Sequence, residues 1–259
     1  MFTKSQTNMK RNCFVLSSLI SKDFKLKYRR SVLGVLWSVL NPLLMMAVMS
    51  VVFSYVFRFE IEHFPVYLIL GITVFNLMSD STSQAMTSIL DSASLIKKVR
   101  IQKIIFPVEK VLFQLVNFVF ALVAVAAVVL FFQVPITWNI VLVPFLIACV
   151  LLFSLGLGML LSALAVFFRD VCHLWSVVIT AWSYATPLFY PVSILPEWAM
   201  PIMSWNPMYQ FVNFFREIVL WGVTPGLNEF AMCAGMALVT LVVGFVVFRK
   251  LERNFILYV

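Results

Sequence analysis

Apolar positions dominate this chain in runs long enough to cross a lipid bilayer as helices. An apolar helix needs about 20 residues to cross about 30 Å of hydrocarbon, and nearly uncharged stretches of that length recur along the sequence. Residues 111–168 carry no formal charge and fit two crossings, because residues 133–139 supply a proline, polar groups and a tryptophan for a turn. We therefore predict six spans. They lie in residues 31–57, 64–90, 111–168 (two spans), 171–196 and 230–248.

The composition changes this picture little, because it also indicates lipid as the solvent. Of the 259 residues, 63% are apolar and 12% are charged, whereas soluble domains are about 45–50% apolar and about 25% charged. So few charges cannot cover so much apolar surface in water, which excludes a soluble globular enzyme. Disorder is excluded as well, because it requires low hydrophobicity.

The placement of the basic residues predicts the orientation of the spans. Lys and Arg concentrate in cytoplasmic loops, and an even number of spans puts both termini on one side. Basic side chains gather in residues 4–30, 97–110 and 249–253, whereas the opposite side receives only Arg58 and Arg216. We expect both termini in the cytoplasm. The first 30 residues contain no long apolar run, so we expect no cleavable signal peptide.

The chain preceding the first span has the pattern of an amphipathic helix. Within residues 13–30, apolar side chains recur four residues apart and basic side chains fall on the opposite face. The apolar row is Leu16, Ile20, Phe24 and Tyr28, and the basic face is Lys22, Lys25 and Arg29. We predict a helix lying on the cytoplasmic membrane surface, with a solvated basic tail as the alternative. Residues 1–30 thus form a cytoplasmic N-terminal region, and residues 31–259 form the six-span domain.

Residues 192–229 have the pattern neither of a span nor of an ordinary loop. The segment is apolar and rich in tryptophan, but prolines interrupt it repeatedly. Irregular backbone at membrane depth is tolerated only against protein or a cavity. We therefore predict a re-entrant hairpin on the outer side, between the fifth and sixth spans.

The sequence carries no motif for catalysis or metal binding. It contains no GxSxG and no HExxH, and its four cysteines are far apart. We therefore expect no catalytic residue and no metal site. It also lacks GxxxxGK[ST], so it cannot hydrolyse a nucleotide with a P-loop, and an ATP-driven role would require a separate subunit.

A polar stripe in the second predicted span is a candidate substrate path. Asn76, Asp80, Ser83 and Gln84 lie largely on one face of a helix. Such a stripe is costly against lipid, and an acidic residue deep in a span is a functional candidate by default. The alternative is a structural hydrogen bond of Asp80 at a helix interface.

A second candidate is an aromatic cluster at the outer end of the fifth span. Its members are Trp182, Tyr184, Phe189 and Tyr190. Aromatic faces can contact sugar rings without fixed hydrogen bonds. An interfacial aromatic belt explains the same composition equally well.

Four blocks of sequence together resemble one family. They are residues 28–43 at the entry to the first span; residues 94–99 with Phe106-Pro107; Arg169-Asp170-Val171 with residues 187–191, 195–197 and Asn206-Pro207; and residues 248–252. In this order the chain resembles the membrane (permease) subunit of ABC type-2 polysaccharide exporters, which move lipid-linked O-antigen, capsule or teichoic acid chains. The resemblance covers nearly the whole chain.

The resemblance implies a homodimer in the bacterial inner membrane, paired with two copies of a separate ATPase subunit that would hold ATP and Mg. It implies a glycan on a polyprenyl-diphosphate carrier as substrate, with O-antigen as the best guess and no nucleic-acid partner. It also implies roles for two basic segments. The ATPase-coupling segment would be Ser94, Leu95, Ile96, Lys97, Lys98, Val99 and Arg100, and the lipid-diphosphate contact would be Arg29 and Arg30. For these two arginines, marking of the topology is the alternative.

Two other classes remain open. A secondary transporter working without ATP often shows two related halves, and we find no such repeat. An integral-membrane transferase acting on lipid-linked sugars should group acidic residues at one face, whereas the glutamates expected outside are dispersed.

Overall fold

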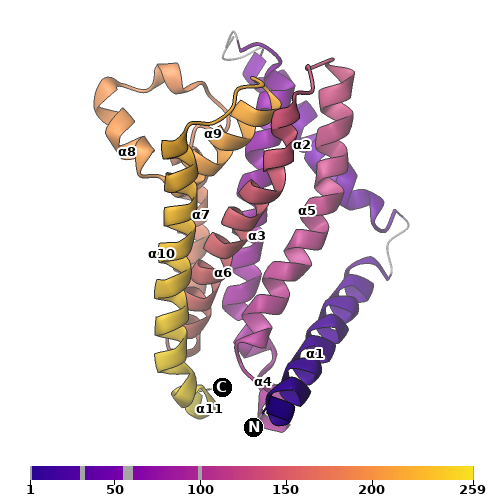
Figure 1. Cartoon of the computed structure of the whole chain (residues 1–259), viewed down its shortest axis with the longest axis vertical. Helices are drawn as coiled ribbons and strands as arrows, with labels where there is room; N and C mark the ends of the chain where they lie inside the picture. Colours follow the sequence, from indigo (N-terminus) through magenta and orange to yellow (C-terminus); the bar gives the residue numbers. More distant parts are fainter. Residues whose placement is uncertain (1, 30–32, 55–60, 99–100, 259) are drawn as a thin grey trace.

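The computed structural model describes residues 2–29, 33–54, 61–98 and 101–258, and these residues contain helices and no β-strand. Joined by short turns and 3₁₀ segments, the α-helices form a bundle with a looped region at one end (Figure 1). They are α1 (Phe2–Tyr28), α2 (Leu36–Val52), α3 (Phe64–Asp91), α4 (Ala93–Lys98), α5 (Ile105–Phe131), α6 (Val143–Phe167), α7 (Val171–Ala185), α8 (Met200–Ser204), α9 (Pro207–Val219), α10 (Leu227–Leu251) and α11 (Phe255–Tyr258).

Within the described residues, four helical segments are long and apolar enough to cross a membrane. They are α3, α5, α6 with the short 3₁₀ helix before it, and α10 with the turn after it. The other two predicted spans form shorter apolar helices, α2 with 17 residues and α7 with 15. The all-helical membrane architecture is therefore confirmed, and the full set of six crossings stays a prediction.

The element boundaries follow local backbone chemistry. Between α5 and α6, Gln133 adopts a left-handed conformation (φ 54°) and Pro135 follows, which places the turn where the sequence predicted it. The fifth predicted span is too long, because α7 ends at Ala185 and not at Pro196. Thr186 precedes Pro187 and is extended, as a residue before proline tends to be.

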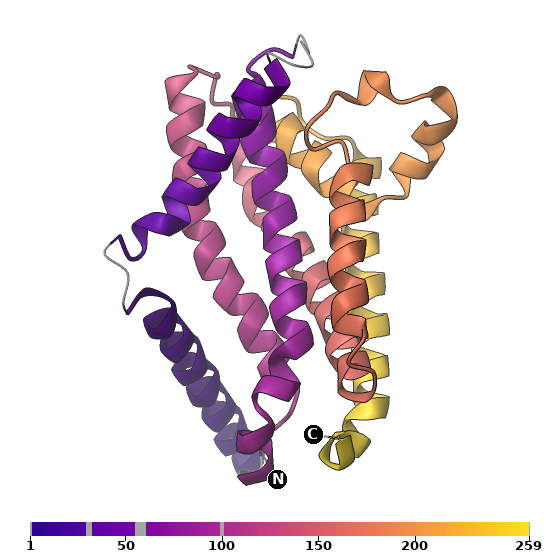
Figure 2. The same ribbon diagram turned by 180° about the vertical axis from the view of Figure 1, so that it is seen from behind.

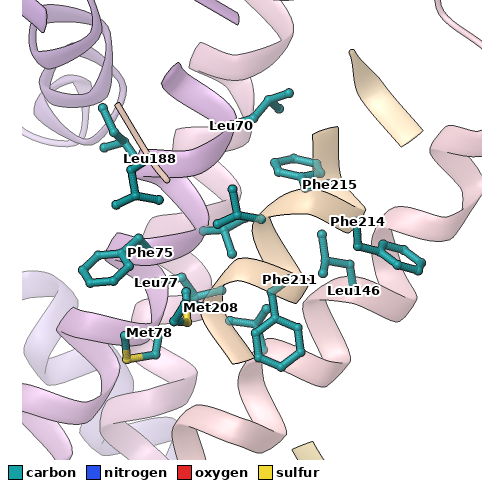
Figure 3. Packing of buried hydrophobic residues seen from close by; sticks show 14 of the residues in the cluster. Leu70, Phe75, Leu77, Met78, Leu146, Leu188, Met208, Phe211, Phe214 and Phe215 are labelled. Atoms are coloured by element: carbon teal, nitrogen blue, oxygen red, sulfur yellow. The ribbon is translucent and has the colours of Figure 1, made fainter. Parts of the chain in front are cut away.

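The segment predicted as a hairpin forms short helices, of which α9 is the longest. Its N-terminus is well defined: the Asn206 side chain accepts hydrogen bonds from the backbone N–H groups of Met208 (3.1 Å) and Tyr209 (3.4 Å), and Pro207 occupies the first turn. One face of α9 is inserted between α3 and α6. Figure 3 shows Phe211 and Phe214 of α9 pointing among apolar side chains, including Leu146 of α6.

The core is centred on α3, which packs against α2, α5, α6, α7 and α9. Of its most apolar stretch, 78% is buried, against 17% for α10, so α3 is the inner helix and α10 a peripheral one. Where α6 crosses α10, Gly156 and Gly244 bring the two backbones into contact, and a Cβ on either would collide with the other helix. Small residues permit this close approach between membrane helices.

The N-terminal helix α1 is longer than predicted, since it begins at Phe2 and not near Cys13. It leans along α5, and its start lies at the same end of the bundle as α11 (Figure 2). Part of its apolar row faces protein, because the Phe24 ring lies 6.3 Å from that of Phe120 and 4.8 Å from that of Tyr28.

Candidate functional site

Two of the four residues of the predicted polar stripe, Asn76 and Asp80, line a pocket between α1, α2, α3 and α5. The pocket has a volume of about 260 Å³ and a mixed polar and apolar wall. Its lining residues are Lys27 of α1; Trp37, Ser38, Asn41 and Pro42 of α2; Thr73, Asn76, Leu77 and Asp80 of α3; and Gln114, Asn117, Phe118 and Ala121 of α5. Ser83 and Gln84 lie half-buried further along α3 and do not line this pocket.

A hydrogen-bonded network closes one side of the pocket. The Lys27 Nζ atom (2.9 Å) and the Tyr28 hydroxyl (3.0 Å) both donate to the Asn117 Oδ1 atom, and the Asn117 amide donates to Gln114 Oε1 (2.8 Å). Tyr28 also shares a hydrogen bond with the Ser38 hydroxyl. These contacts connect the C-terminal end of α1 to α2 and α5, so the N-terminal helix is part of the pocket wall.

The side chains on the opposite wall are available to a ligand. Asp80 and Asn76 are exposed to the pocket, and so is Asn41. Among the described residues, none of these three side chains takes part in a hydrogen bond or ion pair to protein. The structural hydrogen bond of Asp80 at a helix interface, the alternative given above, is therefore not found among the described residues.

The aromatic cluster predicted at the outer end of α7 is assembled, with its members playing different parts. The indole N–H of Trp182 donates to Asn206 Oδ1 (2.8 Å), which fixes this ring against the cap of α9. Tyr190 donates to the backbone oxygen of Tyr184 (2.9 Å), and the Phe189 ring lies 6.3 Å from the Tyr184 ring. Tyr184 is 67% exposed, which makes it the member of the cluster most open to contact.

Arg216, which the sequence predicted only as a basic residue on the outer side, is buried and connects α9 to α3 and to the chain following α7. Arg216 of α9 is 1% exposed, and its guanidinium lies 3.3 Å from the centre of the Tyr67 ring. It donates to three backbone oxygens: Tyr67 (3.2 and 3.3 Å), Pro187 (2.9 Å) and Leu188 (3.1 Å). The Tyr67 hydroxyl in turn donates to the backbone oxygen of Tyr190 (2.9 Å). The N-terminal end of α3 is thereby fixed to the chain following α7.

The polar pocket and the outer cluster are separate places on the same helix. Tyr67 contacts the outer cluster and Asn76 lines the pocket. At a rise of 1.5 Å per residue, the nine residues between them correspond to about 14 Å along α3. The structure therefore does not merge the two candidate groups into one site.

Five residues of the predicted coupling segment, Ser94 to Lys98, lie in α4, and its assignment to the cytoplasmic side stays a prediction. Leu95 and Ile96 pack against a small apolar cluster that includes Phe106 and Phe255, whereas Lys97 and Lys98 are exposed, as is Ser94. This amphipathic arrangement fixes the short helix on the bundle and presents its charges outward. Val99 and Arg100 lie outside the described residues.

The two arginines considered for diphosphate contact fall at the end of α1. Arg29 is exposed and borders a shallow basic groove with Lys22 and Lys25. Arg30 lies outside the described residues. Lys27, which directly precedes the last residue of the apolar row, Tyr28, donates to Asn117 and does not line this groove.

The sequence did not lead us to predict several of the residues that line the pocket. Asn41, Gln114 and Asn117 all lie within predicted spans, and Gln114 and Asn117 are three residues apart, which places them on one helical face. The available signal was uncharged polar residues inside apolar runs. A count of formal charges passes over them.

Comparison with known proteins identifies the class of this chain. A model of the ABC-2 type transporter family matches residues 15–220. The chain belongs to this family of membrane transporters, and its resemblance to the permease subunits of ABC type-2 polysaccharide exporters is confirmed.

Three relatives illustrate the match. The chain is 32% identical to the O-antigen export system permease protein RfbA of Myxococcus xanthus, with 93% of this chain and 94% of the relative aligned. It is 28% identical to RfbA of Klebsiella pneumoniae, with 93% of each chain aligned. It is 21% identical to the polysialic acid transport protein KpsM of Escherichia coli, over 92% of this chain and 93% of KpsM.

Proposed function

We propose that this chain is the permease subunit of an ATP-driven exporter that moves a polyprenyl-diphosphate-linked polysaccharide, with O-antigen as the best candidate, outward across the bacterial inner membrane. The observation that carries the proposal is full-length similarity to permeases named for O-antigen export and polysialic acid transport. The absence of a P-loop from the sequence supports a division of labour in which a separate ATPase supplies the hydrolysis.

Six crossings are part of this proposal. At 1.5 Å per residue, α2 and α7 are about 25 Å and 22 Å long, somewhat less than the hydrocarbon thickness of about 30 Å. Local thinning and the residues that flank each helix accommodate such a mismatch at a fraction of a kcal/mol per Å. Six crossings put α1, α4 and α11 together on the cytoplasmic side, with the short helices before α10 on the outer side.

A homodimer is the second part of the proposal. Stripping sugar hydroxyls of water without new partners costs on the order of a few kcal/mol each, so a glycan needs a continuous polar path. Among the described residues, the polar pocket between α1, α2, α3 and α5 and the aromatic cluster near the end of α7 are small and lie apart, so neither forms such a path by itself. Two copies around a shared axis provide the wall area for a path, with the carrier lipid remaining in the bilayer.

We assign coupling to α4 and its following residues. Two apolar side chains fix α4 to the bundle, while Lys97 and Lys98 face away from it. An exposed basic helix on the cytoplasmic side fits a cleft on a partner subunit, and α4 follows α3 after the single residue Ser92. Motion of a docked ATPase would therefore reach the central helix directly.

The test is reconstitution of the chain with its ATPase in vesicles that enclose no glycan and are supplied with the lipid-linked polysaccharide. Export should require both proteins and ATP, and transport by the chain alone without nucleotide would contradict the proposal. Lys97→Glu combined with Lys98→Glu should weaken ATPase association at least about 10-fold, because reversed charges at an interface are unfavourable by several kcal/mol. The matched control is Lys250→Glu with Arg253→Glu, which changes the same charge at the same end of the bundle and should leave association intact.

A further inference from the structure

The pocket between α1, α2, α3 and α5 differs in chemistry from two apolar hollows of the described chain and from the basic groove along α1, which has no acidic residue in its lining. The hollow between α5, α6 and α10 is lined by apolar side chains alone, and the one between the C-terminal halves of α2 and α5 is nearly so. Such walls suit lipid chains. The α1–α2–α3–α5 pocket instead presents a carboxylate, an ammonium group, four amides and two hydroxyl groups within a chain that is otherwise adapted to lipid. Polar groups removed from water require polar partners, so this pocket calls for water or a polar ligand.

The unpartnered groups define what kind of ligand fits. Asp80 offers an acceptor that forms charge-assisted hydrogen bonds, while Asn41 and Asn76 each offer donors and acceptors. Hydroxyl groups match this mixture, because every hydroxyl both donates and accepts. The lining also contains Lys27, but its ammonium group already donates to Asn117 Oδ1 (2.9 Å), and its charge is opposed by the Asp80 carboxylate, so an anion is disfavoured. A metal ion lacks ligands, since no group of three His, Cys, Asp or Glu side chains suited to a metal occurs among the described residues.

An aromatic ring stands beside these polar groups. Trp37 lines the same pocket and is 47% exposed, so part of its surface is open to a ligand. A flat apolar ring surface complements the C–H face of a sugar ring, while carboxylate and amide groups satisfy the hydroxyls at its edge. The volume of about 260 Å³ lies just below the about 300–1,000 Å³ typical of pockets for drug-sized ligands, which favours one ring over a longer chain.

We infer that this pocket is a binding subsite for one neutral sugar ring, with Asp80 and Asn76 bonding its hydroxyls and Trp37 covering its apolar face. The inference rests on the proposed function for the source of the sugar. That source is either a residue of the exported glycan or a free sugar or glycolipid headgroup. The network of Lys27, Tyr28 and Asn117 makes α1 one wall of the subsite.

The direct test is saturation-transfer NMR on the full chain in lipid nanodiscs, without ATPase or nucleotide. The probes are methyl glycosides of glucose, galactose, mannose and N-acetylglucosamine, with inorganic pyrophosphate as the anionic comparison. At least one glycoside should receive saturation and should not be displaced by pyrophosphate. Absence of transfer to every glycoside, or displacement by pyrophosphate, would overturn the inference.

Variants locate the binding. Asp80→Asn preserves the shape of the side chain and should weaken glycoside binding about 10-fold, since hydrogen bonds to charged groups are the stronger ones. Trp37→Leu should weaken it as well. The matched controls are Asp91→Asn, the same change on the same helix outside the pocket, and Trp205→Leu, an exposed tryptophan elsewhere. Binding that both Asp80→Asn and Trp37→Leu leave unchanged lies at another place and refutes the assignment.

Competition identifies the source of the sugar. Displacement of the methyl glycoside by a polyprenyl-diphosphate-linked oligosaccharide, and not by pyrophosphate, would assign the subsite to the exported chain. Failure to displace would assign it to a free sugar or a glycolipid headgroup. ATP-dependent export without glycoside binding would overturn this inference alone, and glycoside binding without ATP-dependent export would overturn the proposed function alone.

Discussion

Replacing Arg216 with methionine should loosen the outer region between α7 and α9. The side chain is 1% exposed and donates to the backbone oxygens of Tyr67, Pro187 and Leu188. Methionine removes the Arg216 donors from all three oxygens, but the Tyr67 oxygen lies inside α3 and keeps its helical N–H partner, and the Pro187 oxygen keeps the Tyr67 hydroxyl (3.3 Å). The Leu188 oxygen is left unsatisfied at about 1–3 kcal/mol, and each of the other two lost hydrogen bonds to the charged group is worth about 1.5–3 kcal/mol, or about 4–9 kcal/mol in all. In the wild type, local unfolding returns the guanidinium to water, which favours unfolding by several kcal/mol. Methionine lacks this effect, which offsets part of the loss. A net destabilisation of about 2–4 kcal/mol follows.

Because the lost contacts are local, the effect belongs to local opening and is read by hydrogen exchange. The backbone amides of Thr186 and Leu188 should exchange about 30- to 700-fold faster in Arg216→Met, which is the same free energy at 1.4 kcal/mol per factor of ten. Arg216→Lys keeps the charge but loses the planar fork of donors, so its exchange rates should lie between those of the wild type and those of Arg216→Met. The control is Arg249→Met, which removes a partly exposed pair with Glu252 (2.8 Å) and a contact with the Phe245 ring, both far along the chain from this region, and it should leave these exchange rates unchanged. Wild-type exchange rates in Arg216→Met would refute the reasoning.

Two further predictions concern packing and pH. Gly244→Leu should lower the thermal midpoint in detergent by at least about 2 °C, because overpacking against Gly156 costs about 1–3 kcal/mol. The control is Gly235→Leu, because no atom lies within 4 Å of the carbon that it adds. Equal midpoints for Gly244→Leu and Gly235→Leu would contradict the close crossing of α6 and α10. Burial above all raises the pKa of Glu217 to about 7 from its ordinary 4.5, so between these values the folded chain holds a proton that the unfolded chain has released. The free energy of unfolding should therefore fall as pH rises from about 4.5 to 7. In thermal melts, Glu217→Gln should make the midpoint depend less on pH over this range, whereas Glu197→Gln, at an exposed position, should not. An unchanged pH dependence in Glu217→Gln would show that another group is responsible.

The membrane class and the long helices could be predicted because they depend on local patterns. Uncharged runs give α3, α5, α6 and α10, and Pro135 marks the turn before α6. The end of α7 was missed because hydropathy continues past Ala185, whereas the backbone changes direction at Thr186-Pro187. Hydropathy does not report the restriction that a proline places on the backbone of the residue before it, although Pro187 is present in the sequence.

The candidate site could be predicted only in part, because its other members come from distant segments. Asp80 was identifiable as an acidic residue deep in a span. Its neighbours Lys27 and Asn117 come from α1 and α5, and pairing such residues requires the tertiary fold. Arg216 illustrates the same limit, since a basic residue in an outer segment looks like a solvated charge until its backbone acceptors are brought together.

The continuity of α3 has a mechanical consequence. Its 28 residues form an unbroken rod about 42 Å long, which meets α4 after one residue at one end and the Arg216 contacts on Tyr67 at the other. No flexible joint lies between these two ends to absorb a displacement. If α3 crosses the bilayer as proposed, a tilt imposed at the end next to α4 would displace the end next to the aromatic cluster as well, because one continuous buried helix connects the two.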